Sequence, residues 1–279
     1  MAPVPRRPER RPRPADWGFG MIFCIAAFAE GGNQIVAASD QRLSLGYTSG
    51  ESLIKASAIH PRWIAMFAGN DIGRVDPILD VAKRTFGLKD TLTRHEIEAG
   101  FVFFMHQELT KRIEASVLSP YGLTLNEFVS KYGVDSFTPD AYADIRQQIT
   151  EIKLGCEFLI YGYDEQQRPH LFHVQERGLV EDYRGMGVCA IGSGSAVAIH
   201  TMFSLGYFIG WPLAETTYGI CAGKFMAERA DLGQATVITT LSKDGQYGFF
   251  EDQPIRRLWE KVGKPCLPPD VADRMPKLK

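Results

Sequence analysis

The stretch 21-MIFCIAAFAEGGNQIVAASDQR-42 permits two incompatible interpretations, and the choice between them decides the fold. Basic residues precede an apolar run that ends in Ala27-Phe28-Ala29, a pattern typical of a secretory signal with a small-residue cleavage site. The same letters are typical of two short strands joined at Gly31-Gly32. The first interpretation removes Cys24 with the signal, whereas the second places it at the beginning of a sheet.

The composition is that of an ordinary globular protein, with 279 residues of which 45% are hydrophobic and 23% charged. The formal net charge of −2 gives no reason to expect a nucleic-acid partner. Positive charge is concentrated in the first fourteen residues, where five arginines stand against one glutamate. No apolar stretch approaches the roughly 18–20 residues that a membrane helix needs, so we expect no membrane association.

The cysteines favour a reducing compartment. There are five, an odd number, and no two of them form a Cys-x-x-Cys pair, so neither a disulfide framework nor a zinc site is indicated. His170 and His173 are three residues apart on an expected strand, which directs them to opposite faces and argues against a metal site. We therefore expect a cytoplasmic protein without a metal or other cofactor. The cysteines are Cys24, Cys156, Cys189, Cys221 and Cys266.

Periodicity along the chain predicts strands, two helices, strands, two helices and strands, in that order. Residues 117–153 have the pattern of an inserted helical segment. Antiparallel sheets with helices on both outer faces make a four-layer α+β sandwich (αββα), which is the fold class we expect. The expected strands are 22–29, 34–40, 53–59, 63–69, 156–163, 170–175, 179–183, 188–191, 235–240 and 247–251, and the expected helices are those from 71, 93–116, 196–205 and 212–229.

The chain divides into one folded domain and two tails. Five prolines among the first fourteen residues oppose both helix and sheet, so residues 1–20 are expected to be a disordered tail. This tail is either dispensable, with Met21 as an alternative initiator, or a partner-binding arm. The domain is expected over 21–255, with its helical insertion at about 117–153, and 256–279 is expected to be a second tail.

Several motifs, in order, resemble those of proteasome β-type subunits and of the related bacterial ring protease. The likeness runs from about residue 22 to 251, omitting 117–153. Ile35–Arg42 resembles the family's second strand, and Lys55–Pro61 resembles its lysine-bearing strand with the turn that follows. Ala65–Gly69 resembles the strand end that closes its active site. The later matching motifs are Cys156–Asp164, Ala190–Ala196 and Val237–Gly245.

This resemblance implies an N-terminal-nucleophile (Ntn) fold, assembly of identical chains into stacked rings, and hydrolysis of peptide or other amide bonds. Active members of the family attack with the first residue left after self-processing. The α-amino group of that residue acts as the base, and a neighbouring lysine lowers its pKa electrostatically.

Two charged residues carry over from the family. Lys55 matches the lysine, and a lysine in an apolar strand needs a reason because a buried ammonium without a partner is costly. Asp40 matches the aspartate that would pair with it and keep it charged. The alternatives are a surface lysine on the outer face and a solvated carboxylate at a strand end.

The supporting residues are matched less directly. Gly69 would let the backbone approach the scissile carbonyl and donate its N–H to the oxyanion, or it is a plain strand-ending glycine. Ser193 matches the serine that helps to orient the nucleophile's amine, or it belongs to a glycine-rich turn that caps the next helix. The family's late aspartate has no clean counterpart, because Asp231 is a residue or two out of register.

The nucleophile is the main departure from the family, because no threonine stands near Met21. Counting back sixteen residues from Asp40 reaches Cys24, whereas counting back from Lys55 without a gap reaches Phe23, which cannot attack. Cysteine is chemically competent, but Cys24 would have to be freed by cutting Phe23–Cys24. The alternative is a buried structural cysteine on a core strand.

Three hypotheses therefore remain. The first is a hydrolase with Cys24 as the nucleophile, supported by Asp40, Lys55, Gly69 and Ser193. The second is a catalytically silent subunit that serves as a ring or scaffold component. The third is export through the apolar run with an extracellular function.

Overall fold

The computed structural model describes residues 23–40, 42–45, 48–51, 55–69, 72–228, 236–250 and 257. Both expected tails, 1–20 and 256–279, therefore lie outside the described residues apart from residue 257. The same is true of Met21, Asp231 and Cys266. No helix of the described part is long and apolar enough to cross a bilayer.

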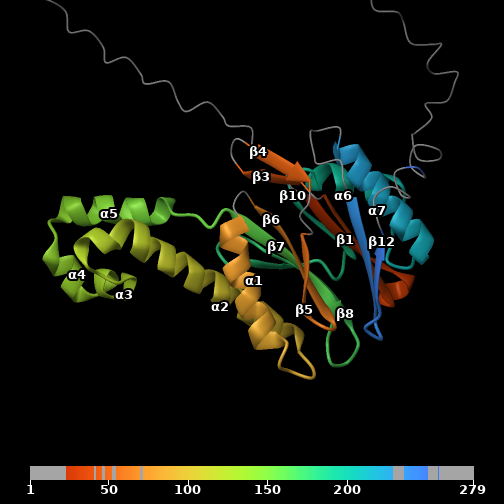
Figure 1. The fold of residues 1–279 in the computed structure, drawn as a ribbon, viewed down its shortest axis with the longest axis horizontal. Coiled ribbons are helices and arrows are strands. Elements are labelled where there is room, and N and C mark those ends of the chain that lie inside the picture. The colour runs from red at the N-terminus through yellow and green to blue at the C-terminus, as the bar shows by residue number, and fades with distance from the viewer. Residues whose placement is uncertain are drawn as a thin grey trace, which may run out of the picture.

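Two five-stranded antiparallel sheets form the centre of the molecule (Figure 1). The first has the order β10-β1-β2-β11-β12, with bounds Val188–Gly192, Phe23–Ala29, Gln34–Asp40, Thr236–Ser242 and Tyr247–Phe250. The second has the order β5-β6-β7-β8-β9, with bounds Ala56–His60, Trp63–Gly69, Cys156–Tyr163, Pro169–Val174 and Val180–Asp182.

The opening stretch of the sequence forms an interior hairpin. β1 lies between β2 and β10, and all seven of its residues are buried. The short turn from Glu30 to Gly32 is possible because Gly31 and Gly32 adopt positive φ angles of 68° and 88°, which suit glycine. Cleavage after Ala29 would remove an interior strand, which argues against the signal-peptide interpretation.

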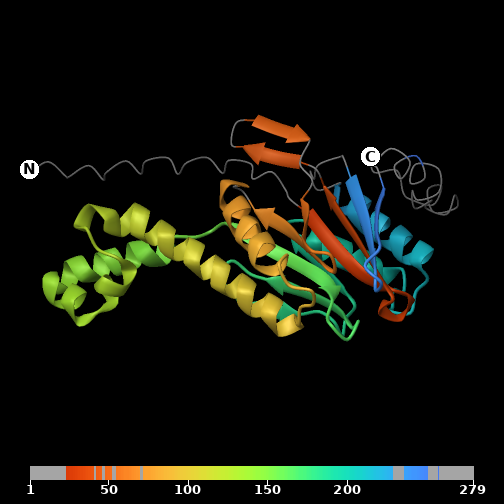
Figure 2. The same ribbon diagram turned by 60° about the horizontal axis from the view of Figure 1, so that its bottom comes forward.

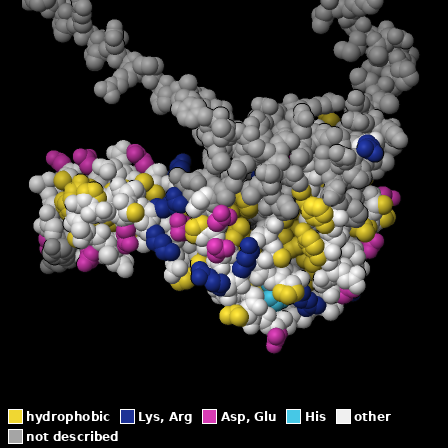
Figure 3. All heavy atoms as spheres, in the orientation of Figure 1, with side chains coloured by type: hydrophobic (Ala, Val, Ile, Leu, Met, Phe, Trp, Pro, Cys, Tyr) yellow, Lys and Arg dark blue, Asp and Glu magenta, His cyan; other side chains and the backbone are white. Residues whose placement is uncertain are grey.

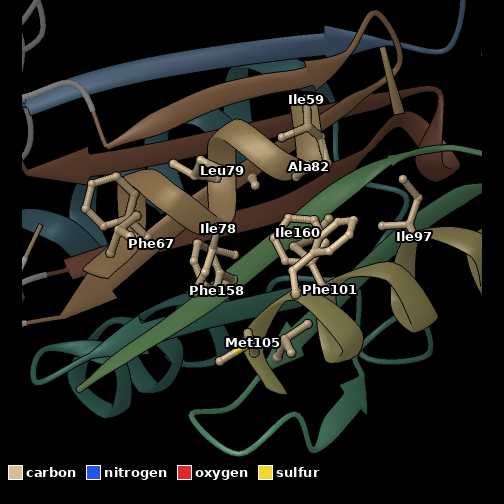
Figure 4. Close-up of a cluster of buried hydrophobic side chains, with 14 of the residues drawn as sticks. Ile59, Phe67, Ile78, Leu79, Ala82, Ile97, Phe101, Met105, Phe158 and Ile160 are labelled. Atoms are coloured by element: carbon tan, nitrogen blue, oxygen red, sulfur yellow. The ribbon is translucent and has the colours of Figure 1, made fainter. Parts of the chain in front are cut away.

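Helices cover both outer faces, so the fold is the expected four-layer αββα sandwich. Helices α1 (Ile72–Phe86) and α2 (Arg94–Ile113) pack on the β5–β9 sheet, where Ile78, Phe101, Phe158 and other apolar side chains interdigitate (Figure 4). Helices α6 (Ser195–Ser204) and α7 (Leu213–Glu228) pack on the other sheet. A third apolar cluster fills the space between the sheets.

Local sequence signals explain the helices of the α1–α2 layer. Thr93 and Glu96 form the capping box that begins α2, as the pattern Thr-x-x-Glu predicts. The stripe Val75, Ile78, Leu79 and Ala82 of α1 is buried against the sheet, as its helical spacing predicts.

The inserted segment forms a helical lobe beside the sandwich (Figure 2). After α2 the chain continues through a π-helical turn (Glu114–Leu118), a 3₁₀ turn (Ser119–Tyr121), α3 (Leu125–Val129), α4 (Lys131–Ser136) and α5 (Pro139–Glu151). These helices enclose a small core of their own around Phe128. The sequence pattern over 125–132 is typical of a single helix, but Ser130 is extended and separates α3 from α4. Gly133 permits this turn, since a Cβ there would come within 2.2 Å of the Phe128 carbonyl oxygen.

The connection between β2 and β5 has a polar sequence over 47–51 that is typical of a loop, but the structure is more regular. It contains a separate two-stranded hairpin, β3 (Arg42–Leu45) and β4 (Thr48–Glu51). The strand expected over 53–59 begins only at Ala56, so Lys55 directly precedes β5. Strands of only four residues give too short a pattern to be recognised in the sequence.

Candidate functional site

Several strand ends meet at one end of the sandwich, which we call the site end. β1 begins there, β2 and β10 end there, and the register pairs Phe23 with Gly192, Cys24 with Ser39, and Asp40 with Thr236. All the described candidate residues lie on strands or turns at this end, as the positions of the motifs imply.

Asp40 and Lys55 form a buried ion pair. Both residues are fully buried, and the Lys55 ammonium donates to Asp40 Oδ1. The Phe23 amide also lies 3.4 Å from Oδ1, whereas Asp40 Oδ2 has no hydrogen-bond partner among the described residues. Burial raises the pKa of the Asp40 carboxyl, and the nearby Lys55 charge offsets only part of this effect. The surface and solvated alternatives for these two residues are therefore wrong.

Cys24 lies inside the core between the two sheets. It is fully buried, and its Sγ donates a hydrogen bond to the Phe67 carbonyl oxygen at 3.3 Å. Burial raises the pKa of the thiol well above its ordinary value, although the charge of Lys55 acts in the opposite direction. Burial therefore favours the neutral thiol over the thiolate that would attack a carbonyl.

Phe23, the residue before Cys24, is also part of the core. Because side chains alternate along a strand, Phe23 points to the other face of the sheet, where it packs in the cluster under α6 and α7. It is fully buried, and its backbone pairs with Gly192 of β10. A chain that began at Cys24 would lose this buried aromatic ring and the amide that faces Asp40.

Gly69 and Ser193 lie at the ends of β6 and β10. A Cβ at Gly69 would come within 2.6 Å of the Gly155 carbonyl oxygen, so packing alone requires a glycine there. Ser193 is exposed in the turn that follows Gly192, and α6 begins just after it without a side-chain cap. The roles proposed for these two residues stay predictions.

Comparisons with known proteins agree with this architecture. The family model for the proteasome subunit matches residues 132–205. Among solved structures, Anbu (ancestral β-subunit) from Yersinia bercovieri is similar, with a TM-score of 0.62 and 12% sequence identity. That match covers 92% of this chain and 99% of Anbu. A search of curated proteins gives no match.

The chain has the fold of a proteasome β-type subunit. The family-model match includes Ser193 but ends before α7 and begins after Cys24, Asp40, Lys55 and Gly69. The chemistry of this proteasome-like fold must therefore be argued from the residues themselves.

Two charged residues of the proteasome-like fold escaped the sequence analysis. Lys224 of α7 is fully buried, and its charge helps to lower the pKa of Asp40 against the effect of burial. Its Nζ lies 5.4 Å from the centre of the Phe225 ring. The signal that could have revealed it is a lone lysine in the otherwise uncharged run from 216 to 227.

Glu157 of β7 is the second residue that was missed. Its carboxylate accepts the Gly192 amide at 2.9 Å and lies 2.8 Å from His173 Nε2, so it joins the two sheets beside the start of β1. Burial opposes its ionisation, but His173 and the Gly192 amide outweigh burial and lower its pKa. Its negative charge contributes to raising the pKa of Cys24. Within the described residues no group of three or more His, Cys, Asp or Glu side chains is placed to hold a metal ion.

Proposed function

We propose that this chain is a catalytically silent subunit of the proteasome fold that serves as a component of a homo-oligomeric assembly. The observation that carries the proposal is the position of Phe23. An N-terminal nucleophile must be the first residue of the processed chain, so Phe23 would have to be removed. Phe23 is buried in the core immediately before Cys24, and its amide faces Asp40. Cutting between them would cost the burial of an aromatic side chain, worth roughly 1.5–3 kcal/mol.

The state of the thiol supports the same proposal. Cys24 has no exposed surface, and burial raises its pKa. A reactive cysteine instead lies in an electropositive and partly exposed environment that stabilises the thiolate. Here the Lys55 ammonium is already paired with Asp40, so the negative charge of that carboxylate weakens the effect of Lys55 on the Cys24 thiol.

In a silent subunit the Asp40–Lys55 pair has a structural task. Asp40 ends β2 and Lys55 directly precedes β5, so the pair joins the two sheets at the site end. Such a pair adds little net stability, but removing one partner is costly because it leaves a buried charge alone. The pair can therefore persist after catalysis is lost.

The second candidate function is a peptide or amide hydrolase that uses Cys24 after removal of residues 1–23. It is favoured by the proximity of Lys55, whose charge is the largest influence that lowers the pKa of Cys24. Asp40, Gly69 and Ser193 would support the nucleophile in this scheme, with the Gly69 amide as the oxyanion donor.

Intact mass spectrometry of the purified full-length protein separates the two candidates. A silent subunit keeps Phe23 joined to Cys24 and is not labelled by electrophilic peptide probes such as vinyl sulfones. A mature chain that begins at Cys24, together with probe labelling that Cys24→Ala abolishes, would overturn the silent role and establish the hydrolase.

The assembly and the cellular compartment are part of the same proposal. We propose a ring of identical chains in the cytoplasm, without nucleic-acid or membrane partners. The ring is supported by the likeness to proteasome subunits, and the reducing compartment by four described cysteines that are buried and form no disulfide. Native mass spectrometry would give the number of chains, and a single-chain mass at all concentrations would overturn the assembly.

A further inference from the structure

The helical lobe and the first fourteen residues carry opposite charges of equal size. The lobe, residues 114–151, contains six acidic and two basic residues, a formal charge of −4. Residues 1–14, which we call the arginine–proline segment, contain five arginines and one glutamate, a formal charge of +4. Since the whole chain has a formal charge of −2, all the other residues together carry only −2. The lobe and the segment therefore attract each other electrostatically.

Acidic side chains of the lobe are open to solvent. Glu127, Asp135, Asp140 and Asp144 are exposed, and none of them is paired with a Lys or Arg side chain among the described residues. Hydrogen bonds from Thr124 lower the pKa of Glu127, so this carboxyl is ionised near neutral pH. On the face that Figure 3 shows, acidic side chains surround a group of apolar ones on the lobe. These carboxylates are available to a cationic partner.

Apolar side chains on the same lobe offer prolines a surface to pack on. Tyr121, Val129 and Val134 are 50%, 60% and 47% exposed. The Tyr121 ring meets the Phe137 ring edge-on with centroids 5.4 Å apart, and Phe137 packs in turn on the buried Phe128. Proline-rich segments bind aromatic surfaces in an extended form that needs no sheet ladder. The lobe thus combines the two features that a segment of arginines and prolines requires.

We propose that the lobe binds the arginine–proline segment of the same chain. The arginines between residues 6 and 13 pair with the exposed carboxylates, and the prolines pack on the half-exposed apolar side chains. Guanidinium groups suit this task, because they hold carboxylates through two parallel hydrogen bonds. Of the two roles open to the N-terminal tail, dispensable extension or binding arm, this assigns the second and gives the arm an intramolecular partner.

The lobe returns to the sandwich close to the start of β1. Glu157, shortly after α5, accepts the Gly192 amide at 2.9 Å, and Gly192 pairs with Phe23, the first residue of β1. Residues 15–22 span up to about 28 Å when extended, and fourteen further residues span about 43 Å in the polyproline form. Since α5 has 13 residues and is therefore about 20 Å long, the segment is long enough to lie along the lobe.

Attachment to the same chain selects the lobe over other acidic partners. Arginine-rich segments also bind nucleic acids and anionic membranes, but neither is tethered to this chain. A short flexible linker holds its two ends together at an effective concentration in the millimolar range, which favours the lobe. The inference requires that residues 1–23 stay attached, so it rests on the proposed silent role.

Fluorescence anisotropy of a probe on the segment tests the docking in the full-length protein. Ala2→Cys in a Cys266→Ser background gives one labelling site, because the four described cysteines are buried. The probe should show high anisotropy at low salt and lose it toward roughly 1 M NaCl, where ion pairs at a surface are screened. The same protein with the five arginines replaced by serine gives the value for a free segment.

A pair of matched variants tests where the segment binds. Asp140→Asn/Asp144→Asn should lower the docking equilibrium constant, read from the salt titration, about 3- to 30-fold, because two surface ion pairs are lost. Asp76→Asn/Asp80→Asn is the control, since these aspartates are also exposed and one turn apart, on α1, and it should leave the titration unchanged. Circular dichroism should show native thermal unfolding for both variants.

The proposal is overturned if the wild type has the anisotropy of the arginine-free protein, or if the two paired variants act alike. Anisotropy that falls on dilution would place the segment on another copy, and anisotropy that rises only when RNA is added would make nucleic acid the partner. Intact mass spectrometry of the labelled sample keeps two failures apart. A chain that begins at Cys24 overturns the silent role and removes the segment, whereas a full-length chain with a free segment overturns the docking alone.

Discussion

Two buried aspartates, Asp40 and Asp164, differ in how many hydrogen bonds they accept and in the direction in which their pKa is changed. Asp164 Oδ1 accepts the amides of Gln166 and Arg168, both at 2.9 Å, and Oδ2 accepts Arg168 Nε at 2.8 Å and lies 3.0 Å from His170 Nε2. Burial opposes ionisation here too, but the hydrogen bonds from His170 and Arg168 outweigh it and hold the pKa of Asp164 below its usual range.

Asp40 receives much less support. Its Oδ1 is approached by Lys55 and by the Phe23 amide, its Oδ2 has no partner in the described part of the chain, and burial raises its pKa. Both carboxylate oxygens of Asp164, which holds a turn together, accept hydrogen bonds, whereas one carboxylate oxygen of Asp40 at the site end accepts none from the described residues. Incomplete hydrogen bonding of a buried carboxylate is typical of functional sites, and Asp40 shows it at the site end.

The largest effect should come from breaking the Asp40–Lys55 pair. Lys55→Met leaves the Asp40 carboxylate buried without its cation, which typically costs about 3–5 kcal/mol of unfolding free energy. The double variant Asp40→Leu/Lys55→Met should recover most of that loss, because two apolar side chains replace the pair. Urea denaturation measures both. A single variant as stable as the wild type would show that the pair contributes nothing to holding the sheets.

A smaller loss is expected at Asp164. Asp164→Asn removes the ionic partner of Arg168 and the carboxylate that is hydrogen-bonded to His170, but it keeps one acceptor oxygen for the turn amides. About 1–3 kcal/mol should therefore be lost in the same urea assay. Arg168→Met is the control, since this side chain is 56% exposed and its ion pair should contribute at most about 1 kcal/mol. A larger loss from Arg168→Met than from Asp164→Asn would contradict this account of the turn.

The two aspartates should also give opposite dependences on pH. The folded-state pKa of Asp40 is raised, so its contribution to the unfolding free energy falls as the pH rises from about 3.9, the unfolded value, through the folded pKa. The folded-state pKa of Asp164 is lowered, so its contribution is present above about pH 3.9 and is lost as the pH falls through the folded pKa.

Thermal unfolding midpoints of the wild type, Asp40→Asn and Asp164→Asn across pH 3 to 7 would measure these slopes. The wild type's advantage over Asp164→Asn should grow with pH, and its advantage over Asp40→Asn should shrink. If the unfolding midpoints of the two variants changed in parallel with pH, the two aspartates would not differ in the direction of their pKa change.

Much of the fold was predictable because it follows from short-range patterns. Nearly continuous apolar runs of strand length placed β1, β2, β6 and β7 within one residue of their observed bounds. The hairpin β3–β4 and the break at Ser130 were missed, because four-residue strands and a turn inside a helical pattern leave no periodic signal. The break depends on the contact of Gly133 with Phe128, which the sequence does not display.

The site was only partly predictable, for a related reason. Asp40 and Lys55 stand out as charges within apolar strands, so a pattern reveals them. Glu157 binds Gly192, thirty-five residues further along the chain, and Lys224 acts on Asp40 across the α7–sheet interface, so their importance depends on tertiary packing. The burial of Phe23 likewise follows from the register with β10 rather than from the count of residues back to a nucleophile.

The smallest effect is expected from Cys24, although it lies beside the pair whose disruption should cost the most. If Cys24 is only a core residue, Cys24→Ala removes one buried sulfur and its hydrogen bond to the Phe67 carbonyl, which should cost about 1 kcal/mol in urea denaturation. Iodoacetamide should not modify Cys24 in the folded wild type, because the thiol is fully buried and burial raises its pKa. Peptide mapping after alkylation, with urea-unfolded protein as the control, reads this out. Rapid modification of Cys24 in the folded protein would mean that the site end opens to solvent, and it would favour the hydrolase over the silent subunit.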